Sequence, residues 1–220
     1  MKTPRVAYGN TVRQANKKQR RQRILELAAH LMASEGVEAF TINRLASEAG
    51  VSTPTIHNLF GKKSDIIKEL VSNLIEKMQG IALNPPIDPI ENAKFFIDNV
   101  VAVFEQEGDF YRAAFMSAER VRLFDPRVPD GIFQRAQQLA APRKEWYESG
   151  LFLGNIEPST MMKRVHNSYR LGRIDWVSGY IDLNQLRHQV LEGMFLVYAS
   201  DASPELHARL IEEINGLISL

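Results

Sequence analysis

Residues 41–63, TINRLASEAGVSTPTIHNLFGKK, constrain the fold most, because they contain two short amphipathic segments separated by a few residues around Gly50. Helices this short cannot bury an apolar face alone, so the pair requires a third helix. Thr41 and Ser52 are placed as N-caps, and Pro54 is tolerated in a first turn, where its missing N–H would have had no partner. The inward faces are apolar: Ile42, Leu45, Ala46 and Ala49, then Ile56, Leu59 and Phe60.

The supporting helix is predicted to begin near Lys17. Its charged start, KKQRRQR, runs into apolar residues at three- and four-residue spacing from Ile24 to Met32, and Gly36 is a natural stop. Residues 1–16 have little apolar periodicity and are predicted to form a flexible basic arm, although Thr11 could cap an earlier helix start.

Further helices are predicted over most of the remaining chain, with Gly or Pro at most junctions. Their approximate ranges are 64–83, 88–107, 109–122, 129–148, 159–178, 184–200 and 203–218. No convincing alternation indicates a strand, so the predicted fold class is all-α. A compact first unit over residues 17–66 and a larger helical unit over residues 67–220 are expected.

Charge divides the chain in the same way. Residues 1–63 carry eleven Lys or Arg against four Asp or Glu, a net +7, whereas residues 64–220 carry 16 against 22, a net −6. A basic first third favours an anionic partner, most often nucleic acid, and a solvated basic tail is the alternative.

Several function classes lack their sequence signals. The chain has no cysteine, which excludes disulfides, thiolate zinc sites and cysteine nucleophiles. No secretory signal and no apolar run of about 18 residues is present, so a cytoplasmic location without membrane contact is expected. HExxH, GxSxG and GxxxxGK[ST] motifs are absent, so we expect no enzyme, no metal and no cofactor.

Two capped helices joined by a Gly-containing turn form a helix-turn-helix, whose second helix enters a DNA major groove. The pattern is more specific than that motif, and it resembles the N-terminal domain of the tetracycline-repressor (TetR) family over about residues 21–70. The matching positions are Ile24, Ala28-Ala29, Gly36, Thr41, Leu45-Ala46, Ala49-Gly50-Val51-Ser52, Thr55-Ile56, Phe60 and Lys63. The resemblance implies a homodimeric transcription regulator with a three-helix DNA-binding domain and a variable C-terminal domain for ligand binding and dimerisation.

The resemblance also implies roles for individual residues. The residues that would face base edges are Thr53, Pro54, Thr55 and Asn58, and those that would contact phosphates are Thr41, His57 and Lys63. Their chemistry fits, because Asn pairs with adenine, Thr methyls or Pro touch a thymine methyl, and Lys supplies charge. A helix cap alone is an equal alternative for Thr41.

Two positions depart from the family pattern. His57 stands where the family usually has Tyr, and it can still donate to phosphate, more strongly when protonated. Lys62 stands where a small capping residue is usual, which puts the start of the fourth helix in question. Arg20 and Arg21 are predicted phosphate contacts at the entry to the first helix, where a minor-groove arm and a solvated arm are alternatives.

The larger unit is rich in aromatic residues, most of which a helical core would explain. A pocket would mix them with a few polar groups, and the candidates are Phe104, Phe115, Trp146, Met162, His166, Tyr169 and Arg173. A dimer interface built as a four-helix bundle is predicted from Val165, Gly172, Trp176, Val190, Met194 and Val197, with packing inside one protomer as the alternative.

The expected function is repression at a palindromic site on double-stranded DNA, relieved when a small, hydrophobic effector shifts the angle of the fourth helix. One alternative is a DNA-binding adaptor regulated by a protein partner, which would use the same DNA-contacting residues as the repressor. A helical enzyme is a remote alternative. A larger helical unit without an enclosed cavity would favour the adaptor.

Overall fold

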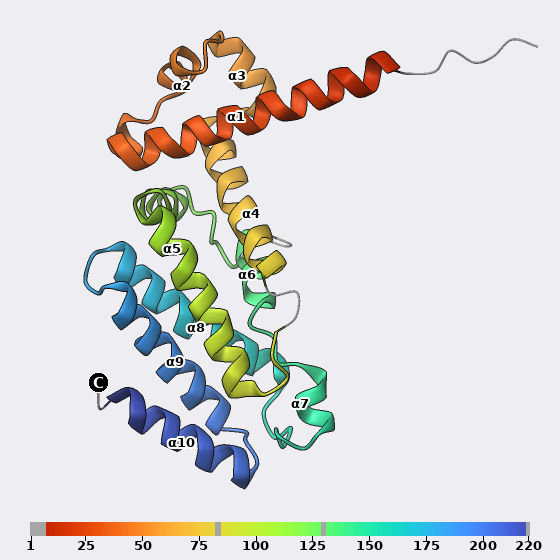
Figure 1. Ribbon diagram of the computed structural model, residues 1–220, viewed down its shortest axis with the longest axis vertical. Coiled ribbons are helices and arrows are strands. Elements are labelled where there is room, and N and C mark those ends of the chain that lie inside the picture. The colour runs from red at the N-terminus through yellow and green to blue at the C-terminus, as the bar shows by residue number, and fades with distance from the viewer. Residues whose placement is uncertain (1–7, 82–84, 129–130, 219–220) are drawn as a thin grey trace, which may run out of the picture.

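The computed structural model describes residues 8–81, 85–128 and 131–218. Within these ranges the chain forms ten helices, and the only β-pairing is an isolated antiparallel bridge between Phe152 and Ala202. The predicted all-α class is therefore confirmed for this part of the chain. Figure 1 shows an elongated molecule with three helices at one end and a larger helical body at the other, connected by α4 (Lys63–Ile81).

The first three helices, α1 (Tyr8–Ala39), α2 (Ile42–Glu48) and α3 (Thr53–Phe60), form the small end of the molecule. Leu45 of α2 and Ile56 of α3 are completely buried and join the core that α1 contributes to. At Gly36 the backbone of α1 leaves the helical conformation with a φ of 79°, a left-handed value that favours glycine. The predicted stop at this glycine is confirmed.

The predicted flexible arm over residues 1–16 is partly helical. Helix α1 begins at Tyr8, whereas residues 1–7 lie outside the described part of the chain. Between Gly9 and Gly36 the sequence contains neither Gly nor Pro, and its long Gln, Lys and Arg side chains lose little rotamer freedom in a helix. These propensities explain why α1 continues beyond the apolar stripe.

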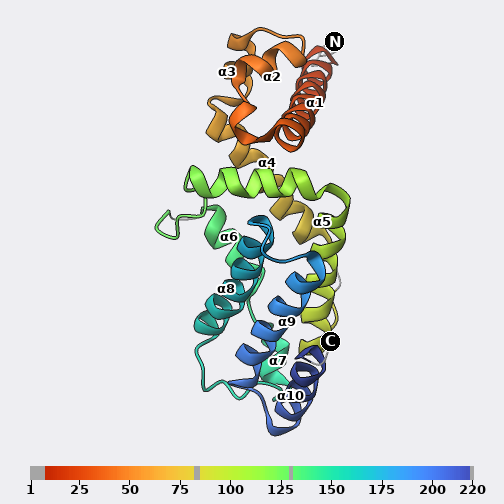
Figure 2. The ribbon, with the colours of Figure 1, turned by 90° about the vertical axis from the view of Figure 1, so that its left-hand side faces the viewer.

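Helix α5 (Pro89–Arg120) consists of two arms that meet at Glu107, whose φ of −138° and ψ of 38° are not helical. The arms correspond to the two helices predicted over residues 88–107 and 109–122. Asp88 caps the first arm through its Oδ1, which accepts from the backbone of Ile90 (3.0 Å) and Glu91 (3.2 Å). In Figure 2 the second arm runs crosswise between the three N-terminal helices and the body.

The prediction of a single helix over residues 129–148 is wrong. The structure has two short helices, α6 (Ile132–Gln138) and α7 (Lys144–Glu148), and residues 129–130 lie outside the described ranges. Pro142 lies between the two helices, and a proline cannot donate its backbone nitrogen and disfavours a helical conformation at the residue before it. Arg143 is extended, with a ψ of 142°, and begins α7.

The last three helices, α8 (Pro158–Val177), α9 (Leu183–Ala199) and α10 (Pro204–Ile218), pack in sequence, α8 on α9 and α9 on α10. Glycines bring α8 and α9 close together. A Cβ atom at Gly172 would lie 2.8 Å from Val190 Cγ2, and one at Gly193 would lie 2.7 Å from Ser168 Oγ. The seam between these two helices is therefore closed within one protomer.

The buried carboxylate of Asp201 organises the loop between α7 and α8. Its Oδ2 accepts from the backbone N–H of Gly154 (3.0 Å), and its Oδ1 accepts from those of Asn155 (2.8 Å) and Ile156 (3.3 Å). One side chain thus satisfies three loop donors that would otherwise need water.

Candidate nucleic-acid interface and pocket

Helix α3 has one buried apolar face and one exposed face. Ile56 and Phe60 are buried, whereas Pro54, His57 and Asn58 are exposed. Figure 1 places α3 at the end of the molecule remote from α10. The exposed face carries no acidic side chain among these positions, so it presents polar groups without repelling an anion.

Hydroxyl groups join α3 to α2 and cap both helices. Thr53 Oγ1 donates to Asn43 Oδ1 at 3.1 Å, and Thr55 Oγ1 lies 2.8 Å from Ser52 Oγ. Ser52 Oγ also accepts from the Thr55 N–H at 3.3 Å, and Thr41 Oγ1 accepts from the Arg44 N–H at 3.1 Å, so both predicted N-caps are confirmed.

Asn58 differs from Thr53 and Thr55. In the described part of the chain its side-chain amide has no hydrogen-bond partner, and it is exposed. The amide is thus available to an external partner without breaking an internal bond.

The junction between α3 and α4 carries two predicted phosphate contacts. His57 Nδ1 lies 2.8 Å from the Gly61 carbonyl oxygen. With Nδ1 as donor, Nε2 of the neutral ring is an acceptor, so only the imidazolium form can also donate to a phosphate. Lys63 Nζ lies 5.5 Å from the centroid of the Phe40 ring, and partial burial lowers the pKa of Lys63.

The helix start that Lys62 put in question is capped by a different residue. Asp65 Oδ2 accepts from the Lys62 N–H at 2.8 Å, so a carboxylate inside the first turn supplies the capping bond. Helix α4 accordingly begins at Lys63.

The structure does not support the predicted phosphate contact of Arg21. Its Nε donates to Glu69 Oε1 at 2.7 Å, it also donates to the Leu59 carbonyl oxygen, and its guanidinium lies 4.3 Å from the centroid of the Phe60 ring. The side chain therefore connects α1 to the end of α3 and to α4. Arg20 is exposed and stays a candidate phosphate contact.

A cavity of about 160 Å³ lies inside the body, lined by side chains from α4 to α9. An engineered cavity of about 150 Å³ holds benzene, so this space is comparable to one aromatic ring. Most of the wall is apolar, including Leu74 and Ile75 of α4 and Phe96 of α5. The cavity therefore touches the helix that carries the N-terminal unit.

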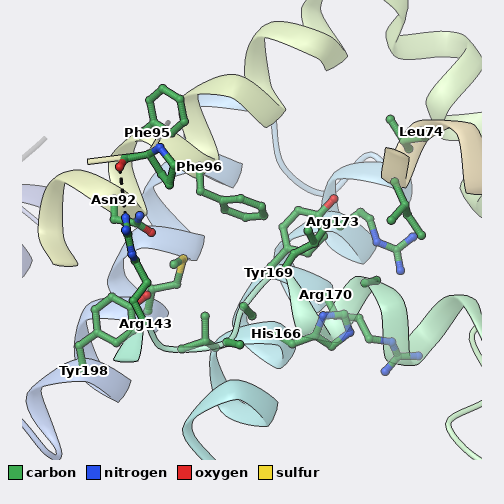
Figure 3. Close-up of a pocket in the computed structure, with 18 of the residues that line it drawn as sticks. Leu74, Asn92, Phe95, Phe96, Arg143, His166, Tyr169, Arg170, Arg173 and Tyr198 are labelled. Carbon is green, nitrogen blue, oxygen red and sulfur yellow. Dashed lines mark hydrogen bonds between the residues drawn. The ribbon is translucent and has the colours of Figure 1, made fainter. Parts of the chain in front are cut away.

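The polar groups of the cavity lie at two ends, as Figure 3 shows: Arg143 and Tyr198 at one, Arg170 and Arg173 at the other, with Tyr169 between them. Arg143 donates to the carbonyl oxygens of Pro85 (3.2 Å) and Pro86 (3.3 Å). The chain thus holds this arginine in place without a buried carboxylate.

Arg173 is only 3% exposed. It donates to Glu119 Oε1 at 3.1 Å, and its guanidinium lies 4.3 Å and 4.6 Å from the ring centroids of Phe115 and Phe124. Burial lowers the pKa of Arg173, and Glu119 opposes this shift. An arginine nevertheless stays protonated in a protein, so a full positive charge lies at this end of the cavity.

His166 and Tyr169 are neutral at pH 7. Burial, followed by the charges of Arg173 and Arg170, lowers the pKa of His166 to about 4. Burial raises the pKa of Tyr169 to about 12. The Tyr169 ring packs edge-on against Phe96, with 5.6 Å between centroids.

Five of the predicted pocket residues line this cavity, and two do not. The lining includes Phe115, Trp146, His166, Tyr169 and Arg173. Phe104 is buried elsewhere and stacks on Trp176 with 4.4 Å between ring centroids, and Met162 is half-buried outside the lining. The helical spacing of aromatic residues does not show which of them line a cavity.

Sequence reasoning missed several lining residues: Asn92, Arg143, Arg170 and Tyr198. Arg170 could have been found, because it lies four residues after His166 and three before Arg173 on one helix. Arg143 carries no such signal, because it reaches the cavity from a loop end.

The predicted dimer-interface residues are packed within one protomer, which corrects that prediction. Val165, Gly172, Trp176, Val190 and Met194 are buried, and Val197 is half-buried against the same core. Periodicity identifies an apolar stripe, but it does not distinguish a stripe facing its own core from one facing a partner. The exposed apolar residues of α8 and α9 are Leu171 (55%) and Leu196 (54%).

Across the described helices, none combines the length and apolarity needed to cross a membrane.

Comparison with known proteins agrees with the N-terminal geometry. Residues 24–70 match the model of a family described as bacterial regulatory proteins, tetR family. The nucleoid occlusion factor SlmA of Mannheimia succiniciproducens is 40% identical over 58 residues, which are 26% of this chain and 27% of that protein. An HTH-type transcriptional regulator of Staphylococcus aureus (strain USA300) is 45% identical over 49 residues, 22% of this chain and 26% of the relative. The chain thus spans about a quarter of the length of these curated relatives.

Similarity to solved structures extends over most of the chain. The TetR family protein CprB from S. coelicolor A3(2) aligns over 90% of this chain and 97% of its own, with a TM-score of 0.60 and 18% identity. A TetR-family transcriptional regulator from Marinobacter aquaeolei VT8 aligns over 90% and 98%, with a TM-score of 0.55 and 18% identity. At this identity the likeness shows the fold. Residues 24–70 thus match the tetR family of bacterial regulatory proteins, and the chain shares the fold of solved structures that are described as TetR-family proteins.

Proposed function

We propose that this protein is a transcription regulator that binds specific DNA sequences by inserting α3 into the major groove. The observation that carries the proposal is the exposed face of α3, which presents Pro54 and Asn58 while Ile56 and Phe60 anchor the helix in the core. The family of the N-terminal residues supports the same function. In this proposal residues 17–66 bind DNA, and residues 67–220 bind an effector and a second protomer.

Asn58 is the principal base-reading residue, because its exposed amide can pair bidentately with adenine. The Thr53 hydroxyl joins α3 to α2, the Thr55 hydroxyl reinforces the N-cap of α3, and both residues offer their methyl groups to thymine. The phosphate contacts are Thr41, His57, Lys63 and Arg20. A net charge of +7 over residues 1–63 supplies the electrostatic part of the affinity.

The protein acts as a homodimer on a palindromic operator. A single short recognition helix reads few bases, and two-fold pairing supplies a second half-site one helical turn away. Leu171 on α8 and Leu196 on α9 are large apolar residues that the protomer leaves exposed, so they are the centre of the proposed interface.

A small molecule in the cavity relieves repression by shifting the population of two orientations of the N-terminal unit. The presence of Leu74 and Ile75 in the cavity wall supports this, because both belong to α4, which follows directly from the recognition helix. The cavity favours an effector over an adaptor that binds only a protein partner.

Selection from randomised duplex DNA, followed by sequencing, tests the DNA-binding part. We expect an enriched palindrome whose base preference relaxes at matching positions in both half-sites in the Asn58→Ala variant. Asn73→Ala is the control, because Asn73 is an exposed asparagine on α4 away from α3, and it should enrich the wild-type sequence. Weak binding that salt abolishes, without any enriched sequence, would contradict the proposal.

A further inference from the structure

The cavity has the opposite charge balance to the part of the chain that surrounds it. Residues 64–220 carry a net −6. Yet, among described residues, the cavity wall contains three arginines, Arg143, Arg170 and Arg173, and neither aspartate nor glutamate. An apolar core needs no such charges, and burying one costs free energy unless a partner compensates it. This cost applies most to Arg173, whose side chain is 4% exposed, against 28% for Arg143 and 38% for Arg170.

Compensation inside the protein is incomplete at the end formed by Arg170 and Arg173. Both guanidinium groups approach one carboxylate, Glu119: Arg173 at 3.1 Å and Arg170 at 3.7 Å, which is beyond hydrogen-bond distance. The Nε atom of Arg170 is buried and has no hydrogen-bond acceptor in the described structure. The two guanidinium groups therefore share one carboxylate, and Arg170 Nε lacks a hydrogen-bond acceptor.

Neither of the two neighbouring titratable groups adds a negative charge. His166 is kept neutral by burial and by the two arginines, and Tyr169 keeps its phenolic proton. Phe96 lies between the two ends of the cavity (Figure 3), and Phe115 belongs to the same wall beside Arg173. The space thus combines a cationic end with an apolar length comparable to one ring.

We propose that the cavity binds a small monoanionic acid, a carboxylate attached to an aryl or short alkyl group. The carboxylate lies between Arg170 and Arg173, and the apolar part lies against Phe96 and Phe115. Charge-assisted bonds from two guanidinium groups recognise the anion, and the aromatic wall recognises the rest. That this acid is the effector rests on the proposed function, whereas its binding does not.

Glu119 makes the proposal more specific. It occupies the position beside Arg173 that the acid needs, so the two carboxylates compete for the same guanidinium groups. Removing the charge of Glu119 should therefore tighten acid binding, and removing that of Arg170 should weaken it. A general loss of structure would weaken binding in both variants.

Calorimetric titration of the DNA-free protein tests the proposal with matched pairs that differ in charge: phenylacetate against 2-phenylethanol, and butanoate against butan-1-ol. We expect at least one acid to bind about tenfold or more tightly than its alcohol, since hydrogen bonds to a charged group are stronger than those between neutral groups. Arg170→Gln should remove this preference, and Glu119→Gln should increase it. Arg164→Gln is the control, because Arg164 is exposed on α8 outside the cavity lining.

The proposal is overturned if every alcohol binds as well as its acid, if no acid binds at millimolar concentration, or if Arg164→Gln has the effect expected of Arg170→Gln. Operator binding is measured separately with the same acids. An acid that binds with the expected variant pattern but leaves DNA affinity unchanged supports the cavity assignment and contradicts effector control. Loss of sequence-specific DNA binding in the acid-free protein contradicts only the proposed function.

Discussion

Replacing Gly172 by alanine should destabilise the protein, although alanine is the better helix former. The added Cβ would lie 2.8 Å from Val190 Cγ2 and 3.0 Å from Leu186 Cδ1. The leucine can move its terminal methyl, but a valine on a helix has essentially one χ1 rotamer and cannot turn away. Helix propensity favours alanine by about 1 kcal/mol, and overpacking costs about 1–3 kcal/mol. We expect a net loss of about 1 kcal/mol in the free energy of unfolding.

Urea denaturation at one fixed protein concentration measures this loss. The combination with Val190→Ala should cost less than the sum of the two single variants, because the smaller partner removes the clash. Gly216→Ala is the matched control, since that glycine lies on α10 with no atom within 4 Å of the added Cβ, and it should be neutral or stabilising. If Gly172→Ala stabilises the protein as much as this control does, the close packing of α8 and α9 is refuted.

Three further predictions concern the body. Burial depresses the pKa of His166 to about 4, below its ordinary 6.5, so between these pH values protons bind preferentially to the unfolded chain. The free energy of unfolding should therefore fall by up to about 1.4 kcal/mol per pH unit as the pH decreases from 6.5 to 4. Equilibrium denaturation should show a shallower fall for His166→Gln. Asp201→Ala leaves three loop N–H donors without their acceptor and should cost about 2–3 kcal/mol in urea denaturation; a loss below about 0.5 kcal/mol would contradict the organising role of this carboxylate. Leu196→Glu should shift sedimentation equilibrium towards the monomer, whereas Leu153→Glu, at a comparably exposed loop leucine, should not; equal masses for both variants would argue against an α8–α9 interface.

The N-terminal unit could be predicted closely because local chemistry determines it. Thr41 and Ser52 cap their helices as predicted, and Gly36 ends the regular part of α1. Each of these caps and helix ends depends on residues within three or four positions, so the local sequence is enough to predict it. The start of α4 shows the limit: the expected cap position is Lys62, and the compensating Asp65 lies one turn inside the helix.

The body could be predicted as a set of helices but not as a packing arrangement. Pro142 lies inside the helix predicted over residues 129–148 and separates α6 from α7. The orientation of an apolar stripe depends on contacts with distant elements. Helical spacing therefore places Gly172 and Trp176 on one face without showing that this face lies in the core of the protomer. Arg173 lies on the predicted side of α8, but its pairing with Glu119 joins residues 54 positions apart, and no local pattern indicates it.

The bend of α5 at Glu107 determines how the N-terminal unit is attached to the body. The second arm of α5 lies under α1 and contacts it, while α4 provides the covalent link (Figure 2). On this same second arm, Arg112 lies 4.2 Å from the Trp176 ring centroid and donates to the Trp176 carbonyl oxygen, so the arm is also attached to α8. Attachment at two separate places restricts the movement of the N-terminal unit more than a single linker would. The orientation of α3 therefore depends on both α4 and the second arm of α5, and a displacement of either one would be passed on to it.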